Sequence, residues 1–134
     1  MLPESPQLLI QLARERYSSD EHATLRRMLA RRAESLIERM DLEEDERYHL
    51  RGSLLAVKER YPEAIAGYSR AVELRPEELR WRYELALLLK HEDKFSEAHE
   101  QAKLCAVMEP GNKEYRTLLK EIIRTRLTTA ESME

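Results

Sequence analysis

The sequence predicts an all-α protein, built as a right-handed α-solenoid of stacked antiparallel helix hairpins with a C-terminal capping helix. Three observations predict this fold class. Charged residues make up 37% of the 134 residues and hydrophobic residues 42%, with only 3 Gly and 5 Pro, which is typical of solvated amphipathic helices. Apolar residues recur at helical spacing in several segments. One segment also recurs 34 positions further along the chain, and such a period indicates a repeat architecture.

The chain is expected to form one helical-repeat domain over residues 1–134, beginning with an off-consensus helical hairpin at 1–44. The first helix should start near Ser5. Residues 18–21, Ser-Ser-Asp-Glu, resemble a capping box and begin the second helix, which we expect to continue to Met40. Apolar residues of this second helix have the i, i+3, i+4, i+7 spacing of one buried stripe. They are Leu25, Met28, Leu29, Ala33, Leu36, Ile37 and Met40.

This stripe can be covered in two ways. The favoured interpretation is that the hairpin packs on the first repeat of the same chain. In the alternative, the helix pairs with a second copy of the chain or with a partner protein, because two repeats are fewer than the usual minimum of three. The residues of that possible homodimer or partner contact are Leu25, Leu29, Leu36 and Met40.

The recurring segment extends from Tyr61 to Pro76 and again from Phe95 to Pro110. Each copy begins with an aromatic residue and ends at a proline, which cannot continue a helix. Small residues at one spacing allow a second helix to approach closely. These small residues are Ala64, Ala71, Ala98 and Cys105. Each copy is therefore predicted to be the second helix of a helical hairpin.

These features resemble the tetratricopeptide repeat, a 34-residue helix–turn–helix with the pattern W-x2-L-G-x2-Y, A-x3-F, A and P. In the first repeat, residues 45–78, the signature positions hold Tyr48, Gly52, Leu55, Ala64, Tyr68, Ala71 and Pro76. In the second, residues 79–112, they hold Leu85, Ala86, Leu89, Ala98, Cys105 and Pro110. Arg51, Arg82 and Ala102 depart from the pattern, so the packing should differ locally at these positions.

Residues 113–126 are predicted to form the capping helix. Its apolar residues lie on one stripe, formed by Leu118, Leu119, Ile122 and Ile123. Lys120 stands where a following repeat would need a small residue, which indicates the end of a repeat array. Residues 127–134 carry no period and are expected to fray.

No catalytic motif is present, so we expect no enzyme, no cofactor and no metal. The sequence has no G-x-S-x-G, phosphate loop or H-E-x-x-H motif. Cys105 occupies a small-residue packing position and is expected to be buried and inert. The stretch from His91 to Lys94 lies at a predicted turn, where charged residues are common, so it is interpreted as a surface turn rather than as a set of metal ligands. His99 lies too far along the helix to activate the Cys105 thiol.

Charge and hydropathy narrow the partner classes. The formal net charge of −3 predicts no nucleic-acid partner, and no apolar run is long enough for a membrane span or a signal peptide. The single cysteine gives no sign of an oxidising compartment, so we expect a cytoplasmic protein, although a piece of a longer or exported protein would show the same features. Arg26, Arg27, Arg31 and Arg32 form a local basic cluster. The cluster is interpreted as a solvated face with ion pairs to Glu34, Glu38 and Asp41 rather than as a patch for an acidic partner.

The resemblance implies a concave groove lined by the first helix of each hairpin. The groove positions in this chain include His49, Ser53, Arg80, Tyr83, Leu87 and Lys90, with Thr117, Glu121 and Arg124 added by the capping helix. Tyr83 and Leu87 are the expected anchors, with Tyr83 packing inside the fold as the alternative. The positions that clamp heat-shock carboxylate tails in related domains do not match, since they hold His49, Ser53, Glu84, Glu114 and Leu118.

The predicted function is that of a non-catalytic scaffold for protein–protein interaction, holding a protein or peptide of unknown identity in this groove. Two alternatives remain open. In the first alternative, the chain is a structural or oligomerising module that acts through its N-terminal helices. In the second, it is a chaperone that caps an aggregation-prone helix. The second alternative follows from a resemblance to the small tetratricopeptide chaperones of bacterial secretion systems.

Overall fold

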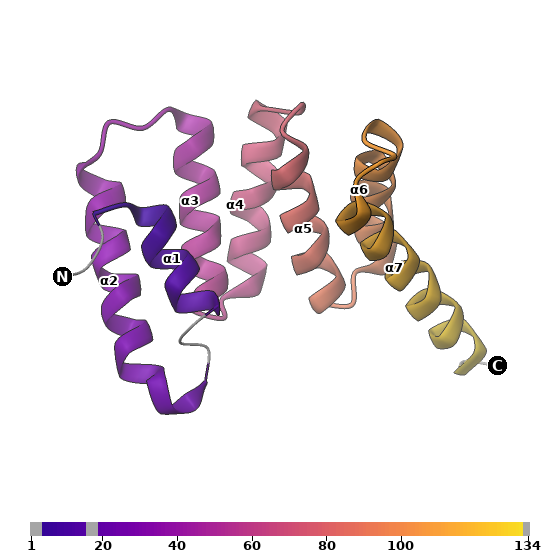
Figure 1. Cartoon of the computed structure of the whole chain (residues 1–134), viewed down its shortest axis with the longest axis horizontal. Coiled ribbons are helices and arrows are strands. Elements are labelled where there is room, and N and C mark those ends of the chain that lie inside the picture. Colours follow the sequence, from indigo (N-terminus) through magenta and orange to yellow (C-terminus); the bar gives the residue numbers. More distant parts are fainter. Residues whose placement is uncertain (1–3, 16–18, 133–134) are drawn as a thin grey trace. The chain divides into compact units, whose positions relative to one another are not determined.

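A computed structural model describes residues 4–15 and 19–132 (Figure 1). Over these residues the regular secondary structure is all helical, with no strand, so the predicted all-α class is confirmed. The helices are α1 (Pro6–Glu15), the short 3-10 helix η1 (Asp20–His22), α2 (Ala23–Arg39), α3 (Glu44–Val57), α4 (Tyr61–Leu74), α5 (Leu79–His91), α6 (Phe95–Met108) and α7 (Lys113–Ser132).

The chain divides into two compact units, Met1–Leu74 and Arg75–Glu134, which are described separately. The first unit contains α1 to α4 and the second contains α5 to α7. In each unit, helices that follow one another in sequence pack against each other. None of the described helices is both long enough and apolar enough to span a bilayer.

The core of the first unit lies among α1, α2 and α3. The central residues of the α2 stripe pack in one cluster with Leu9 and Ile10 of α1 and Leu50 of α3. Met28, predicted to lie in the buried stripe, is instead 55% exposed. Arg47 adds a polar link, because its guanidinium donates hydrogen bonds to the carbonyl oxygens of Ile37 and Met40 at the end of α2. These carbonyls have no partner within the helix, so the contact satisfies them and ties α3 to α2.

The first predicted repeat is the hairpin of α3 and α4, whose helices meet at two glycines. A Cβ atom on Gly52 would lie 3.0 Å from Tyr68 Cδ2, and one on Gly67 would lie 3.2 Å from the Cα of Gly52. Such distances are tighter than most Cβ contacts, so a side chain at either position would require the neighbouring atoms to shift by a few tenths of an ångström. The two glycines therefore set how closely α3 and α4 approach.

The turns within the two repeats have the same geometry. Glu59 and Asp93 lie 34 positions apart and adopt φ values of 61° and 60°, in the left-handed region. After α3, the amide of Arg60 donates to the Leu55 carbonyl and that of Glu59 to the Ala56 carbonyl. This is a Schellman motif, and Asp93 occupies the same place in an equivalent motif after α5. The repeat is therefore visible in the backbone itself.

The core of the second unit is formed by α5, α6 and α7. Its buried residues are Trp81, Leu85, Ala86, Leu89, Ala98, Ala102, Cys105, Tyr115, Leu118 and Ile122. Asn112 caps α7, because its side-chain oxygen accepts a hydrogen bond from the Tyr115 amide at 3.1 Å. The helix continues to Ser132, beyond the predicted end at residue 126.

Candidate peptide-binding surface

A shallow pocket lies between α5 and α7 in the second unit. Its volume is about 280 Å³. The residues that line it are Tyr83, Leu87, Lys113, Glu114, Thr117, Leu118 and Glu121. It combines the two expected anchors of α5 with two of the residues expected from the capping helix, Thr117 and Glu121. We call these lining residues the α5–α7 surface.

Leu87 is the apolar centre of the α5–α7 surface. Its side chain is 40% exposed, although it belongs to a helix whose other leucines face the core or are partly covered. An isolated exposed leucine needs no explanation, but this one lies in a concave site beside an aromatic ring. It therefore offers a contact point for an apolar side chain of a partner.

Tyr83 is partly buried, between the two alternatives of the sequence prediction. Its ring lies 5.3 Å from that of Tyr115 between centroids, and the Arg80 guanidinium carbon is 4.8 Å from the Tyr83 ring centroid. Burial, together with the negative charge of Glu114, raises the pKa of the Tyr83 phenol above its ordinary value. The phenol is therefore neutral at pH 7, and its ring is fixed by neighbours while one side still lines the pocket.

Two ion pairs join α5 to α7 around the pocket. Arg80 Nη1 lies 2.9 Å from the Glu114 carboxylate, and Lys90 Nζ lies 3.0 Å from the Glu121 carboxylate. All four side chains are partly exposed, and exposed pairs of this kind contribute about 0–1 kcal/mol each. A partner can therefore exchange its own charges for these at low cost. The pairing of Arg80 with Glu114 has no sequence signal within one helix, because the two residues lie 34 positions apart on different helices.

The first-unit residues predicted for the groove have other surroundings. Ser53 is only 3% exposed, and its hydroxyl lies 2.6 Å from the Tyr68 hydroxyl in a buried hydrogen bond. The His49 ring packs edge-on against Tyr68 at 5.2 Å between centroids. Ser53 is thus held in the core, and His49 is half-buried beside it. Neither residue contributes to the α5–α7 surface, which lies wholly within the second unit.

The residues of the possible oligomer contact are also mostly inside the first unit. Leu29 and Leu36 are buried, and Leu25 packs partly buried against the same core. Met40, at the end of α2, is 37% exposed. Packing of α1 and α3 against α2 therefore already covers most of the apolar residues that a second copy would contact.

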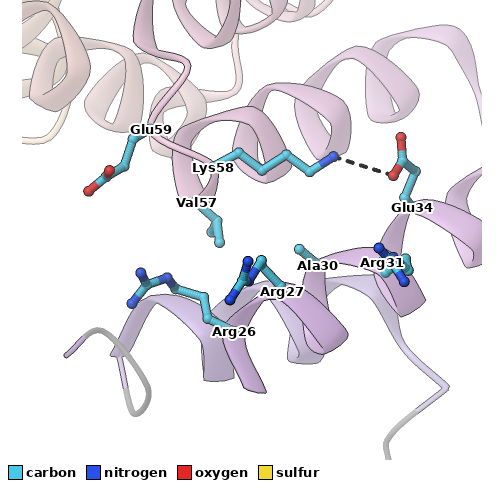
Figure 2. Close-up of a pocket in the computed structure, with 8 residues that line it drawn as sticks. All are labelled: Arg26, Arg27, Ala30, Arg31, Glu34, Val57, Lys58 and Glu59. Carbon is cyan, nitrogen blue, oxygen red and sulfur yellow. Dashed lines mark hydrogen bonds and ion pairs between the residues drawn. The ribbon is translucent and has the colours of Figure 1, made fainter. Parts of the chain in front are cut away.

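Two of the four arginines of the basic cluster have partners that are not among the expected carboxylates. Arg32 pairs with Glu4 at 3.7 Å, and Arg26 donates a hydrogen bond to the Ser19 carbonyl. Glu34, an expected partner of the cluster, instead forms an ion pair with Lys58 at 3.3 Å (Figure 2). The contact between α2 and the end of α3 could not be read from helical spacing within α2.

The single thiol is buried, in agreement with the sequence prediction. Cys105 is fully buried, and its Sγ donates to the Leu79 carbonyl oxygen at 3.4 Å. Burial raises the pKa of the Cys105 thiol to about 11, so it stays protonated and a poor nucleophile at neutral pH. Across the residues that the structure describes, no group of three or more His, Cys, Asp or Glu side chains could hold a metal ion.

Comparison with known proteins identifies the fold but no relative in sequence. No protein-family model and no curated protein matches the chain. Among solved structures, a chain in the crystal structure of the APC/C hetero-tetramer Cut9-Hcn1 matches with a TM-score of 0.59 and 17% identity. The match covers 90% of this chain and 24% of that chain, so this chain spans about a quarter of the neighbour's length. The chain therefore has a tetratricopeptide-like helical-repeat fold, as the sequence resemblance predicted.

Proposed function

We propose that the chain is a non-catalytic protein-binding module and that it holds a peptide segment of its partner on the α5–α7 surface. The observation that carries this proposal is the exposed Leu87 in a pocket beside Tyr83, within a repeat fold. Repeat folds of this kind present extended binding surfaces. The solved neighbour belongs to a hetero-tetramer, and this supports protein partners as a general class.

Binding would proceed through an apolar centre and a charged rim. An aliphatic or aromatic side chain of the partner contacts Leu87 and the Tyr83 ring, excluding water from both. Arg80 and Lys90 then offer cations to acidic groups of the partner, while Glu114 and Glu121 accept basic groups. Buried anchors dominate the free energy of such contacts, and rim charges set orientation and association rate.

The oligomerising alternative gains less support from the packing. A dimer formed through the α2 stripe would have to expose Leu29 and Leu36, which now lie in the core with α1 and α3. Exposing them loses about 1.5–3 kcal/mol for each side chain before any contact with a second copy is made. Partner binding on α5 and α7 needs no such rearrangement.

The test compares two equally exposed leucines. Leu87 is 40% exposed and lines the pocket, whereas Leu104 is 38% exposed on α6 and does not. We expect Leu87→Asp to reduce partner capture from a native extract at least tenfold, because a carboxylate replaces the apolar contact. Leu104→Asp should leave capture within twofold of the unmodified chain. Quantitative mass spectrometry of the captured proteins measures both.

Stability has to be checked in the same experiment. Both substitutions are at exposed positions, so their urea midpoints should stay close to that of the unmodified chain. Equal capture by the Leu87→Asp and Leu104→Asp variants, at equal stability, would remove the α5–α7 surface as the binding site.

A further inference from the structure

A second and larger pocket lies in the first unit, between α2 and the C-terminal end of α3. Its volume is about 520 Å³, within the range of peptide and small-ligand sites. Figure 2 shows Arg26, Arg27, Ala30 and Arg31 on one helix, facing Val57, Lys58 and Glu59 across the pocket. We call this the α2–α3 pocket. It shares no residue with the α5–α7 surface.

The α2–α3 pocket is positively charged on a chain whose formal net charge is −3. Four cationic side chains line it, against the carboxylates of Glu34 and Glu59. Glu34 is already neutralised by its ion pair with Lys58. Arg27 and Arg31 are exposed, and no carboxylate within residues 4–15 and 19–132 lies in ion-pair range of either. These two arginines can therefore pair with an incoming anion without first breaking an ion pair.

The arrangement of these cations favours several separate carboxylates over one compact anion. Arg27 and Arg31 are spaced i and i+4 along α2, so their Cβ atoms lie about 5–6 Å apart on one face. Alternate residues of an extended peptide lie about 6.6–6.8 Å apart and point to the same side. Two acidic residues at alternate positions can thus reach both arginines at once. Glu59, on the opposite wall, would repel a dense polyanion such as nucleic acid.

The opposite wall accepts the other side chains of such a peptide. Val57 lies across from α2 and is only partly buried, and Ala30 leaves space beside the arginines. Residues between the acidic positions of an extended peptide point away from α2, towards α3. An aliphatic residue there would cover Val57, while the arginine side chains close over it with their own methylene groups.

The wall formed by α3 is held in place by its turn. The Schellman hydrogen bonds fix Lys58 and Glu59 at the end of α3, and Lys58 spans one end of the pocket to reach Glu34. Arg26 and Glu59 lie at the other end (Figure 2). The pocket is therefore formed without the peptide, which lowers the entropy lost on binding.

We propose that the α2–α3 pocket binds an extended acidic segment of a partner protein in which acidic and aliphatic residues alternate. Arg27 and Arg31 bind the carboxylates, and Val57 contacts the aliphatic residue between them. The pocket lies at the edge of the α3–α4 turn and acts independently of the α5–α7 surface. On this proposal, the basic cluster forms part of a second binding site in addition to being a solvated face.

The test uses the full chain and a defined probe, a fluorescein-labelled peptide of sequence Gly-Glu-Leu-Glu-Leu-Glu-Gly. Fluorescence anisotropy should show saturable binding that weakens as sodium chloride rises from 50 to 300 mM, because the charges are exposed. A peptide with glutamine in place of glutamate should not bind. A peptide with the same composition but its three glutamates adjacent should bind more weakly, because only alternate carboxylates match the two arginines.

Variants locate the binding to the pocket. The double variant Arg27→Glu with Arg31→Glu should raise the Kd at least tenfold, while Arg116→Glu, an exposed change on α7, should leave it within twofold. Glu34→Gln should lower the Kd about two- to fivefold, because it frees Lys58 for the peptide and removes a repelling carboxylate. A gain of affinity cannot arise from unfolding.

Several outcomes would overturn the proposal. They are no binding at 1 mM peptide, equal binding of the glutamine peptide, or an unchanged Kd in the double variant. Binding of pyrophosphate or of an RNA duplex at Arg27 and Arg31 in place of the acidic peptide would also overturn it. The Leu87→Asp variant should bind the acidic peptide with an unchanged Kd, so failure of the α5–α7 surface and failure of the α2–α3 pocket are distinguishable.

Discussion

The two repeats share one backbone plan but pack their helices in different ways. In the first, Gly52 on α3 lies against the large ring of Tyr68 on α4. Thirty-four positions on, Ala86 on α5 and Ala102 on α6 occupy the equivalent positions, and both are fully buried. A small residue on one helix accommodates a large one on its partner, or two small residues share the space. The period therefore fixes the backbone, whereas the pair of side chains fixes the local packing.

The same comparison bears on the exposure of one equivalent position on the first helix of each repeat. Tyr68 carries a hydroxyl into the core, so its neighbour Ser53 is buried and hydrogen-bonded to it. Ala102 has no such group, and Leu87, at the position equivalent to Ser53, is exposed in the α5–α7 surface. A change of one core residue thus accompanies the conversion of a core position into a surface one.

The largest expected effect follows from removing the Tyr68 ring. We expect Tyr68→Ala to lower the free energy of unfolding by about 3–5 kcal/mol, because it leaves a cavity and a buried Ser53 hydroxyl without its partner. Tyr68→Phe keeps the ring and should cost about 1–2 kcal/mol, the loss of the hydrogen bond alone. Urea denaturation followed by far-UV circular dichroism measures both. Similar losses in the two variants would show that the hydroxyl, and not the ring, holds the hairpin together.

Much of this comparison could be predicted from the sequence, and the remainder depends on contacts between helices. The 34-residue period, Pro76 and Pro110 identify the fold because they act through local helix geometry. The period also showed that Ala102 departs from the signature, and a different local packing was expected there. Whether Ser53 would face the core or a ligand depends on Tyr68, which lies on the next helix. Spacing within one helix carries no such information.

The α2–α3 pocket was hidden for the same reason. The basic cluster is visible in the sequence, but helical spacing predicts its counterions within α2 and the segment that follows it. In the structure, Glu34 pairs with Lys58 and Arg32 pairs with Glu4, and each partner lies on another part of the chain. Ion pairs between helices depend on how the helices are placed, which helical periodicity does not report.

An intermediate effect tests the pairing of small and large residues directly. Gly52→Ala should destabilise the chain by about 1–2 kcal/mol, because the clash with Tyr68 outweighs the better helix propensity of alanine. In the Tyr68→Ala background the same change should cost about 1 kcal/mol less, since the helices can then adopt the arrangement of Ala86 and Ala102. The double-mutant cycle is measured by urea denaturation. Strict additivity would show that the backbone atoms of α4, and not the Tyr68 ring, exclude the Cβ.

The smallest effect tests the feature that the two repeats share. Glu59 and Asp93 both hold a left-handed conformation that glycine adopts without strain. Glu59→Gly should raise the free energy of unfolding by about 1 kcal/mol, whereas Asp93→Gly should raise it by about 0.5 kcal/mol, because aspartate tolerates this conformation better than glutamate. Thermal unfolding resolves both changes, and Glu100→Gly, at an exposed position within α6, serves as a control that should destabilise by about 1 kcal/mol. A loss of stability in Glu59→Gly would contradict the Schellman turn that places Lys58 and Glu59 on the wall of the α2–α3 pocket.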